Sequence, residues 1–188
     1  QRLPAALQID TGMCRLGLSP TDLRHLASAD LQALDLCLVI SHLACAEETS
    51  NPLNEAQRAR FERLRGLLPE APASLANSSG IYLGPAFHYA LCRPGIALYG
   101  VNPTPGRANP VAPVVTLEAP VLQVHEVAEP GSVGYGATYR SAPGTRIATV
   151  PVGYADGYLR AASGRATARI AGREVPLAGR VSMDLISL

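Results

Sequence analysis

The chain has 188 residues, of which 47% are hydrophobic, and its formal net charge is +1. A charge so close to zero argues against a surface built to bind nucleic acid. No segment approaches the ~18 consecutive apolar residues of a membrane span, and no signal-peptide pattern is present, so a membrane partner is not expected.

The reactive side chains set a second limit. All sixteen residues counted as Lys plus Arg are arginine, and the chain contains no lysine. Arginine does not form Schiff bases and keeps its proton, so any chemistry that needs a lysine nucleophile requires residues outside this chain. The cysteines form no Cys-x-x-Cys pair, which argues against a zinc site, and they favour reduced thiols and a cytoplasmic location. They are Cys14, Cys37, Cys45 and Cys92.

The first part of the chain alternates between strand and helix patterns. The sequence PAALQID (4–10) predicts a buried strand. The sequence SPTDLRHLASADLQAL (19–34) predicts one helix, which Ser19 caps and Pro20 begins. Short connections between such segments indicate parallel β/α units.

The next strand is predicted at 34–44, and an amphipathic helix follows at 50–68. A short strand at 73–77, an irregular helical piece and the sequence CRPGIALYG (92–100) complete this region. The arginines of the helix at 50–68 are expected to form a solvated face. These arginines are Arg58, Arg60, Arg63 and Arg65.

The composition changes after residue 100. The sequence VNPTPGRANPVAP (101–113) contains four prolines and no helical period, so it is predicted to be a linker. Short apolar runs separated by glycine turns fill 114–188 and predict an incomplete antiparallel β domain. Within it, IAGREVPLAG predicts a hairpin that turns near Gly172 and Arg173.

Residues 1–100 therefore contain about four β/α units, which is half of an eight-stranded (β/α)8 TIM-type barrel. The predicted fold class is α/β plus all-β: a partial barrel domain at 1–100, a linker at 101–113 and a C-terminal β domain at 114–188. Half a barrel leaves two open strand edges. Either the other half lies outside this chain, or the units form a small open sheet.

The sequence LQIDTGMCRLG (7–17) places Asp-Thr-Gly after the first strand. An aspartic protease presents its catalytic carboxylate in the same tripeptide, but it needs two aspartates in one site, and this chain has a single copy. The favoured interpretation is a turn in which Asp10 and Thr11 bond the backbone and Gly12 supplies a permissive φ angle. Arg15 then stands at the carboxyl end of the strand, where barrels keep their active sites.

Seven stretches, taken in order, resemble the alanine racemase family, which are pyridoxal-phosphate enzymes with an N-terminal (β/α)8 barrel and a C-terminal β domain. The resemblance starts in the middle of the family's barrel and stops inside its β domain, so the chain is expected to be an incomplete and inactive piece. The missing half would carry the lysine that binds pyridoxal phosphate, in agreement with the absence of lysine here. The stretches are IDTGMCRLG (9–17), SHLACAEE (41–48), NSSG (77–80), RPGIALYG (93–100), GYGATY (134–139), VPVGYADGY (150–158) and GRVSMD (179–184).

The resemblance implies a cofactor site at the end of the barrel, where phosphates commonly bind. The Ser78 hydroxyl and the backbone N–H groups of Gly95 and Ile96 would hold the phosphate. The alternative is a helix N-cap at Ser78 and a strand-end glycine at 95.

Arg93 matches the arginine that faces the pyridine nitrogen, which it would keep neutral, so that return of the proton to Cα is favoured. The alternative for Arg93 is a buried ion pair with neighbouring acids.

Tyr135, in GYGATY, matches the family's catalytic tyrosine, which exchanges a proton on one face of the substrate while the lysine serves the other face. A tyrosine is a weak base at neutral pH, so nearby positive charge must favour its phenolate. His42 and Arg93 resemble the family's network that does this. The family's tyrosine reaches the cofactor from the other subunit, which implies an obligatory homodimer. As alternatives, Tyr135 is a turn residue and His42 a hydrogen-bonded core histidine.

Arg15 and the backbone around Met183 match groups that bind the substrate carboxylate, a role that suits the two-pronged geometry of arginine. Tyr154 matches a residue that lines the entrance, with hairpin packing as the alternative.

Gln8 departs from the family pattern. It replaces a lysine that many members carbamylate to buttress the arginine, although its amide oxygen can still reach Arg15. Ser74 replaces a histidine near the cofactor.

Three functions follow as expectations. In the first, the intact protein is a bacterial alanine racemase that interconverts L-alanine and D-alanine by two-base proton transfer on pyridoxal phosphate and supplies D-alanine for peptidoglycan. The second keeps the fold but acts on another amino acid, which Gln8 could permit. The third makes the chain a non-catalytic module for phosphate binding or assembly.

Overall fold

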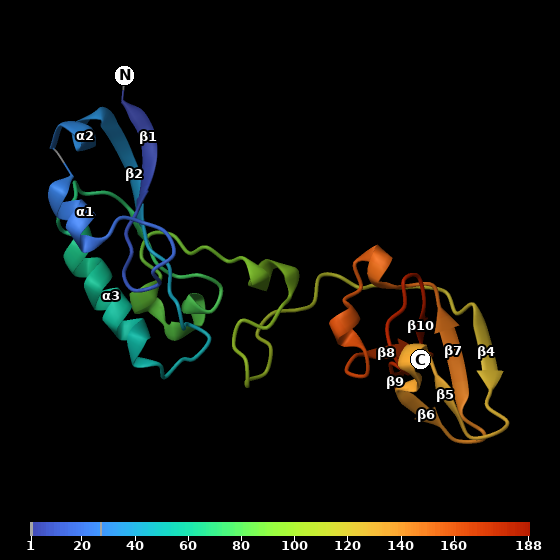
Figure 1. Ribbon diagram of the computed structural model, residues 1–188. Helices are drawn as coiled ribbons and strands as arrows, with labels where there is room; N and C mark the ends of the chain where they lie inside the picture. The colour runs from blue at the N-terminus through green and yellow to red at the C-terminus, as the bar shows by residue number, and fades with distance from the viewer. Residues whose placement is uncertain (1, 27) are drawn as a thin grey trace. The chain divides into compact units, whose positions relative to one another are not determined.

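The computed structural model describes residues 2–26 and 28–188, which form two compact units. The first unit ends at Thr116, and the second runs from Leu117 to Leu188. The first contains parallel strands and helices, and the second contains antiparallel strands (Figure 1). Each unit has its own cluster of buried hydrophobic residues.

Three parallel strands in the order β1-β2-β3 form the sheet of the first unit. The strands overlap the predicted ranges 4–10, 34–44 and 73–77, with β1 beginning one residue early, and neighbours in sequence pair in parallel as β/α units require. The strands are β1 Leu3–Gln8, β2 Leu34–Ile40 and β3 Ala73–Ser74. The helices are α1 Pro20–His25, α2 Ser28–Ala33 and α3 Pro52–Arg65, with 3-10 helices η1 Gly80–Leu83, η2 Pro85–Phe87 and η3 Ile96–Tyr99.

The prediction of one helix at 19–34 is wrong. Two short helices occupy this region, because Leu26 at the end of α1 adopts an extended backbone (φ −64°, ψ 117°). The predicted N-cap is confirmed: the Ser19 hydroxyl accepts a hydrogen bond from the Asp22 N–H at 3.1 Å, and the Asp22 carboxylate accepts the Ser19 N–H at 2.8 Å. These reciprocal bonds form a capping box.

Two strand predictions also differ from the structure. The predicted burial of the strand at 4–10 is wrong for most of β1, because Pro4 and Ala6 are exposed and Leu7 is only partly buried; Leu3, just before that range, is 68% exposed. Among the described residues, β1 is an edge strand that pairs with β2 alone. The fourth β/α unit has no extended strand at 92–100; a single parallel bridge joins Asn77 to Arg93, and η3 follows.

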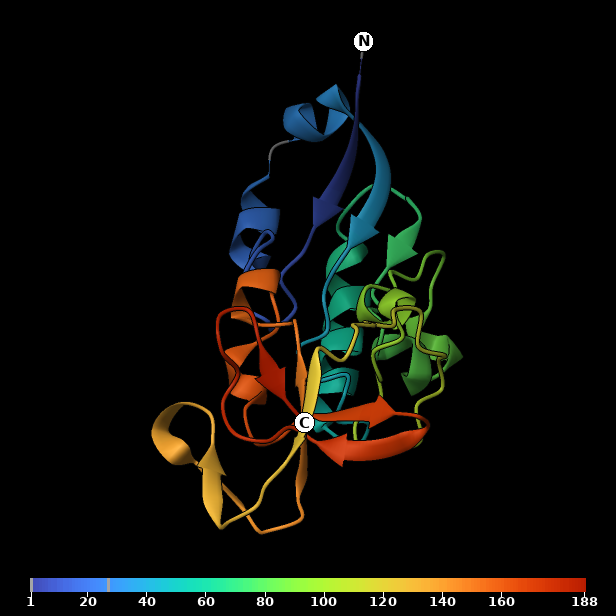
Figure 2. The ribbon, with the colours of Figure 1, turned by 90° about the vertical axis from the view of Figure 1, so that its right-hand side faces the viewer.

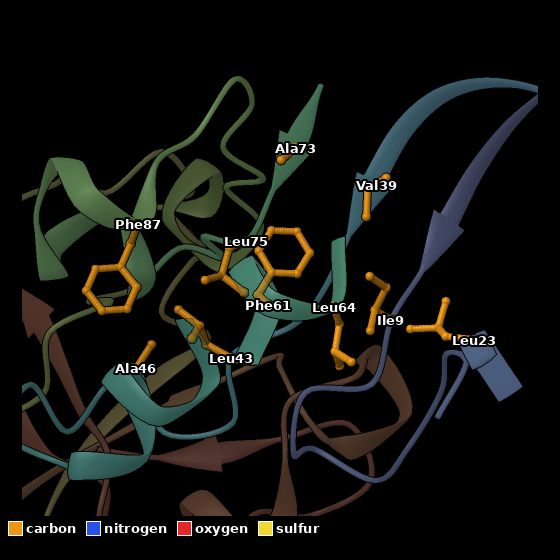
Figure 3. Close-up of a cluster of buried hydrophobic side chains, with 10 residues drawn as sticks. All are labelled: Ile9, Leu23, Val39, Leu43, Ala46, Phe61, Leu64, Ala73, Leu75 and Phe87. Atoms are coloured by element: carbon orange, nitrogen blue, oxygen red, sulfur yellow. The ribbon is translucent and has the colours of Figure 1, made fainter. Parts of the chain in front are cut away.

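The core of the first unit lies where α3 packs against the sheet (Figures 2 and 3). Phe61 of α3 is fully buried and Leu64 nearly so, and they share a cluster with Ile9, Val39 and Leu75. The spacing of three residues between Phe61 and Leu64 places both on one face of the helix. This packing fixes α3 beside the carboxyl ends of β1 and β2.

The arginines of α3 divide into two groups. Arg58 pairs with Glu55 at 2.7 Å and Arg65 with Glu62 at 2.9 Å, on the partly exposed side of the helix. Arg60 departs from the solvated face that was predicted, because its guanidinium donates to the Thr11 carbonyl at 3.0 Å. Helix α3 therefore contacts the loop that follows β1.

The segment at 101–113 contains no helix or strand. Its first part nevertheless belongs to the first unit: Pro103 and Thr104 are buried, and the Arg107 guanidinium donates to the Thr49 hydroxyl at 3.0 Å. Residues 102–107 therefore lie against the loop that leads into α3.

The second unit is antiparallel throughout its described pairs, as the sequence predicts. Its sheets have the orders β10-β7-β4, β5-β6 and β8-β9. The predicted hairpin is β8-β9, and its turn at Ala171 and Gly172 lies one residue earlier than expected. The strands are β4 Gln123–Glu126, β5 Gly131–Val133, β6 Tyr139–Ser141, β7 Arg146–Val150, β8 Thr167–Ile170, β9 Arg173–Pro176 and β10 Ile186–Ser187. The 3-10 helices are η4 Tyr135–Ala137, η5 Tyr154–Asp156 and η6 Arg160–Ala162.

Residues 2–26 and 28–188 contain neither a candidate membrane span nor a candidate metal site. Within these ranges no helix is long and apolar enough to cross a membrane. In the same ranges, no three His, Cys, Asp or Glu side chains are grouped so that they could hold a metal ion.

Replacing the buried ring of α3 tests the core. Phe61→Ala is expected to lower the free energy of unfolding by about 3–5 kcal/mol, because it leaves a cavity between α3 and the sheet. Urea titration followed by circular dichroism measures the loss. The exposed Arg63→Ala on the same helix should change stability by less than about 0.5 kcal/mol. Equal losses in the two variants would contradict this description of the core.

Candidate functional site

A cavity of about 490 Å³ opens at the carboxyl ends of the strands of the first unit. Its lining includes His42 after β2, Ser78 after β3, and Arg93, Gly95 and Ile96 on the segment that ends in η3. All five residues expected around a cofactor therefore share one cavity. Parallel β/α folds bind their ligands at this end of the strands.

Another cavity, of about 500 Å³, lies near the opposite ends of the same strands, beside Arg2, Asp35 and Glu70. None of the residues expected to bind cofactor or substrate lines it. The cavity that contains His42 and Arg93 is therefore the candidate functional site.

Arg93 is held by neutral oxygen atoms. Its guanidinium donates to the Ser74 hydroxyl and to the Ser41 carbonyl, each at 2.5 Å. Burial lowers the pKa of Arg93 from its ordinary value, an effect that nearby Cys92 partly opposes. The alternative of a buried ion pair is wrong for the described part of the chain, because no carboxylate there lies within salt-bridge distance of Arg93.

Ser74 explains part of this arrangement. It is fully buried, and its hydroxyl donates to the Leu91 carbonyl while accepting from Arg93. The residue that departs from the family pattern is thus a direct support for the arginine. The sequence resemblance alone left its contact in doubt.

Ser78 organises the other side of the cavity. Its hydroxyl accepts the Gly95 N–H at 2.7 Å and the Ala97 N–H at 3.2 Å. The alternative of a local helix N-cap is wrong, because the residue before η1 is Ser79, and the Gly80 N–H is accepted by Asn77 instead. Ser78 therefore fixes the start of η3, a segment distant in sequence.

His42 lies between positive charges. Burial is the main cause that lowers the pKa of His42 from 6.5, and the guanidinium groups of Arg93 and Arg15 lower it further. At pH 7 the His42 imidazole is therefore less protonated than an ordinary histidine. Arg15 therefore influences His42 by its charge, although it is exposed and does not line the cavity.

The loop that carries Arg15 is built on Asp10. One carboxylate oxygen of Asp10 accepts the N–H groups of Gly12, Met13 and Cys14 at 2.9, 3.0 and 3.1 Å. These bonds, with that of Gly12 the largest cause, lower the pKa of Asp10 from 3.8. The predicted turn is confirmed, including a positive φ of 134° at Gly12, and it leaves Asp10 a structural role rather than the protease role.

Two details of this loop differ from expectation. The Thr11 side chain does not bond the turn backbone; its hydroxyl contacts the Ser41 hydroxyl at 2.7 Å. The amide nitrogen of Gln8 donates to the Leu16 carbonyl at 3.0 Å, so Gln8 holds the loop next to Arg15. The expected bond from the Gln8 oxygen to Arg15 is not among the hydrogen bonds of the described residues.

The second unit presents Tyr135 outward. Tyr135 is 70% exposed at the start of η4, in a tight turn between two glycines. The Arg180 guanidinium lies against this turn, so closely that a Cβ added at Gly136 would come within 3.0 Å of it. The turn therefore has a defined shape, although its phenol projects from the unit.

Met183 and Tyr154 are joined by a close backbone contact. The Met183 carbonyl accepts the Ala155 N–H at 2.9 Å, and a Cβ added at Gly153 would lie 2.0 Å from the same oxygen. Tyr154 is 43% exposed, and its ring centroid lies 5.9 Å from the Arg160 guanidinium carbon. Tyr154 sits in the 3-10 helix η5 rather than in a packed hairpin.

Sequence reasoning missed the residues that support this site. Ser41, Gln57 and Thr11 are buried and hydrogen-bonded to one another or to candidate residues. One signal was available: Gln57 lies four residues before Phe61, so it falls on the apolar face of the predicted helix. A polar residue on such a face needs buried partners.

The chain therefore combines parallel β/α units, which have a cavity at their strand ends, with an antiparallel β unit. Two family models match the chain: the alanine racemase N-terminal domain at residues 1–103 and the alanine racemase C-terminal domain at residues 114–188. Together they cover most of its length. The chain belongs to the alanine racemase family.

Individual relatives agree with the family models. An alanine racemase of Rhodospirillum rubrum is 53% identical over the whole chain, which covers 50% of that protein. A catabolic alanine racemase of Mesorhizobium japonicum is 52% identical, again over the whole chain and 49% of the relative. The crystal structure of alanine racemase from Bartonella henselae with covalently bound pyridoxal phosphate has a TM-score of 0.88 and 39% identity, over 98% of this chain and 52% of that one. The chain thus spans about half the length of these relatives.

The Asp10 turn gives a pH-dependent prediction. Asp10→Ala should cost about 1–2 kcal/mol of stability at pH 7, because three N–H groups lose a charged acceptor. The lowered pKa means that this contribution is present above pH 3.8 and is lost as the pH falls through the folded-state pKa. Urea titrations at pH 7 and pH 3 measure it. A penalty that is as large at pH 3 as at pH 7 would contradict the ionised turn.

Proposed function

We propose that this chain forms the second half of the (β/α)8 barrel and most of the β domain of a pyridoxal-phosphate-dependent alanine racemase. The observation that carries the proposal is that His42, Ser78, Arg93, Gly95 and Ile96 line one cavity in a member of this family. The reaction is the interconversion of L-alanine and D-alanine. Because the chain spans about half of its relatives, the activity is proposed for the longer protein.

The residues of the cavity fit pyridoxal phosphate. The Ser78 hydroxyl and the Ile96 N–H suit phosphate oxygens, whereas the Gly95 N–H that was expected to join them is donated to the Ser78 hydroxyl at 2.7 Å. A Cβ added at Gly95 would meet no atom within 4 Å, so the backbone is open to close approach. Arg93 brings a positive group with no carboxylate partner in the described chain. When bound, pyridoxal phosphate supplies the electron sink that makes the α-proton of an amino acid removable. The lysine that would bind it covalently is not in this chain.

Arg93 would direct the outcome at the α-carbon. Its donors point to neutral oxygens on one side, held by Ser41 and Ser74, and it keeps its own protons. Beside the ring nitrogen of pyridoxal phosphate, this guanidinium would act as a donor and would leave that nitrogen neutral, which would favour return of the proton to the α-carbon over transamination.

Tyr135 would move the proton on one face of the α-carbon. Its exposure on the second unit suits a phenol that completes the site of a partner subunit, so we propose a homodimer with shared active sites. Positive charge must favour the phenolate. His42 and Arg93 would form the network beside the phenol, and Arg93 would supply its permanent positive charge.

Arg15 would bind the substrate carboxylate, together with the backbone at Met183. The Asp10 turn holds the loop of Arg15, and Gln8 bonds the next residue of that loop with a neutral amide. A neutral support exerts less electrostatic pull on the guanidinium than a carbamylated lysine would. Binding of carboxylate substrates should therefore depend on the loop geometry more than on charge at position 8.

The use of the product has two candidates. Biosynthetic use would supply D-alanine for peptidoglycan. Two relatives, from Mesorhizobium japonicum and Agrobacterium fabrum, are catabolic alanine racemases at 52% and 47% identity, and they favour a role in alanine breakdown. Growth of a deletion strain with D-alanine added, or with alanine as the carbon source, distinguishes the two roles.

The activity test uses the full-length protein that carries this chain. Polarimetry should show conversion of L-alanine and of D-alanine toward the racemic mixture, faster than of serine or lysine. The chain of residues 1–188 alone should show neither racemisation nor a borohydride-reducible adduct of pyridoxal phosphate on a side chain, because it has no lysine. Faster conversion of another amino acid would replace the substrate assignment, and no conversion at all would reject the function.

Removing the phenol tests the catalytic base. Tyr135→Phe in the full-length protein should lower kcat about 10²–10⁴-fold, which is the usual contribution of a positioned acid or base. Tyr139→Phe is a matched control in the same unit, and it should retain activity. A Tyr135→Phe variant as active as the Tyr139→Phe variant would exclude Tyr135 from the proton transfer.

A further inference from the structure

We infer that Gln57 is a positioning residue of this site, whose buried amide locks the loop that carries Arg15 to the loop that carries His42. The geometry stands on hydrogen bonds within the first unit. The consequence for catalysis rests on the proposed function.

The amide of Gln57 is fully buried and fully used. Its nitrogen donates to the His42 carbonyl at 2.9 Å and to the Thr11 hydroxyl at 3.2 Å, and its oxygen accepts the Ala44 N–H at 2.8 Å. Thr11 lies in the loop after β1, whereas His42 and Ala44 lie in the loop after β2. The side chain of Gln57 therefore bridges the two loops. Among the described hydrogen bonds, no other side chain of α3 bonds to both of them.

The orientation of this amide is determined by its partners. The His42 carbonyl can only accept, and the Ala44 N–H can only donate. The nitrogen of Gln57 must therefore face His42 and its oxygen must face Ala44. A rotated amide would place like groups against each other at both contacts.

The direction of the hydroxyl bonds follows from the same count. The Ser41 hydroxyl donates its one proton to the Ile9 carbonyl at 2.8 Å. In the 2.7 Å contact between Thr11 and Ser41, the donor must then be Thr11. A single directed chain results, from Gln57 to Thr11 to Ser41 to the carbonyl of Ile9.

The same series of hydrogen bonds also reaches Arg93, the residue expected to face the cofactor ring. The backbone carbonyl of Ser41 accepts the Arg93 guanidinium. The side chain of Ser41 is fixed by Thr11, and Thr11 is fixed by Gln57. Displacing the amide of Gln57 should therefore disturb Arg15, His42 and Arg93 together.

An ordinary packing role does not account for this residue. Gln57 lies on the face of α3 that buries Phe61 and Leu64, where an apolar side chain would avoid the cost of burying an amide. All three side-chain bonds of Gln57 go to site loops, and none goes to its own helix. The hydrogen bonds of the Gln57 amide to two loops therefore explain a polar residue at this buried position better than packing does.

The test is Gln57→Glu in the full-length protein. Glutamate keeps the volume but loses both N–H donors, and its oxygen faces the His42 carbonyl. Hydrogen–deuterium exchange should become faster in the segments 9–15 and 41–46, and kcat/KM for alanine should fall about 10–100-fold, as expected for misplaced groups. The control is Asn54→Asp, which makes the same amide-to-acid change at a buried position one turn earlier that bonds only the Glu48 carbonyl through its side chain.

The outcomes separate the two proposals. Faster exchange in both segments for Gln57→Glu, but not for Asn54→Asp, supports the bridge even if the wild-type protein does not racemise alanine. Exchange equal to that of the wild type in both segments, or kcat/KM equal to that of Asn54→Asp in an active enzyme, would overturn the inference. An inactive wild type would instead count against the proposed function.

A second pair of variants keeps the test decisive if Gln57→Glu does not fold. Thr11→Val preserves shape but removes the hydroxyl between Gln57 and Ser41, whereas Thr11→Ser retains the hydroxyl. Thr11→Val should speed exchange at 41–46 and lower kcat/KM about 10-fold, and Thr11→Ser should restore both values to within about 2-fold of the wild type. Identical behaviour of the two variants would contradict a directed hydrogen-bond chain.

Discussion

The site depends on a guanidinium that is buried without a carboxylate. A buried charge is costly unless hydrogen bonds satisfy it, and Arg93 obtains these bonds from the Ser41 carbonyl and the Ser74 hydroxyl. Neutral acceptors hold the group in place without cancelling its charge. The charge of Arg93 therefore remains available at the cavity, where burial first, and then the guanidinium groups of Arg93 and Arg15, lower the pKa of His42.

The same constraint explains why the strand ends are so densely hydrogen-bonded. Arg93 is supported by short contacts from two different strand ends, and each of those must itself be fixed. Ser41 is fixed through Thr11 and Gln57, and Ser74 through the Leu91 carbonyl. The apolar core beneath, around Phe61, supplies the rigid base on which this polar layer rests.

Local patterns predicted much of this molecule because they depend on neighbours in sequence. Ser19 and Asp22 form the expected cap, the strand at Leu34–Ile40 follows its apolar run, and Asp10 forms the expected turn. The errors arose where distant contacts decide. The exposure of Leu3 reflects the strand's position at a sheet edge, and the reduction of the fourth unit reflects the Ser78 hydroxyl, which binds Gly95 and Ala97 from 17 and 19 residues away.

The candidate site shows the same division. Motifs identified Arg93, Ser78 and His42, which lie on one cavity. They did not identify Gln57 or Ser41, whose partners lie in other loops, and they could not relate Tyr135 to the cavity because it belongs to a separate unit. Hydrogen bonds between distant loops can be identified only once the fold is known, whereas motif residues can be identified from the sequence.

The contact between Gly153 and the Met183 carbonyl limits how this family member can change over evolutionary time. Any side chain at position 153 would overlap that oxygen, so substitutions there should be selected against. The two segments cannot slide past one another, and an insertion in either would be transmitted to the other. New substrate preferences should therefore arise by exchanging side chains on a fixed frame rather than by lengthening these loops.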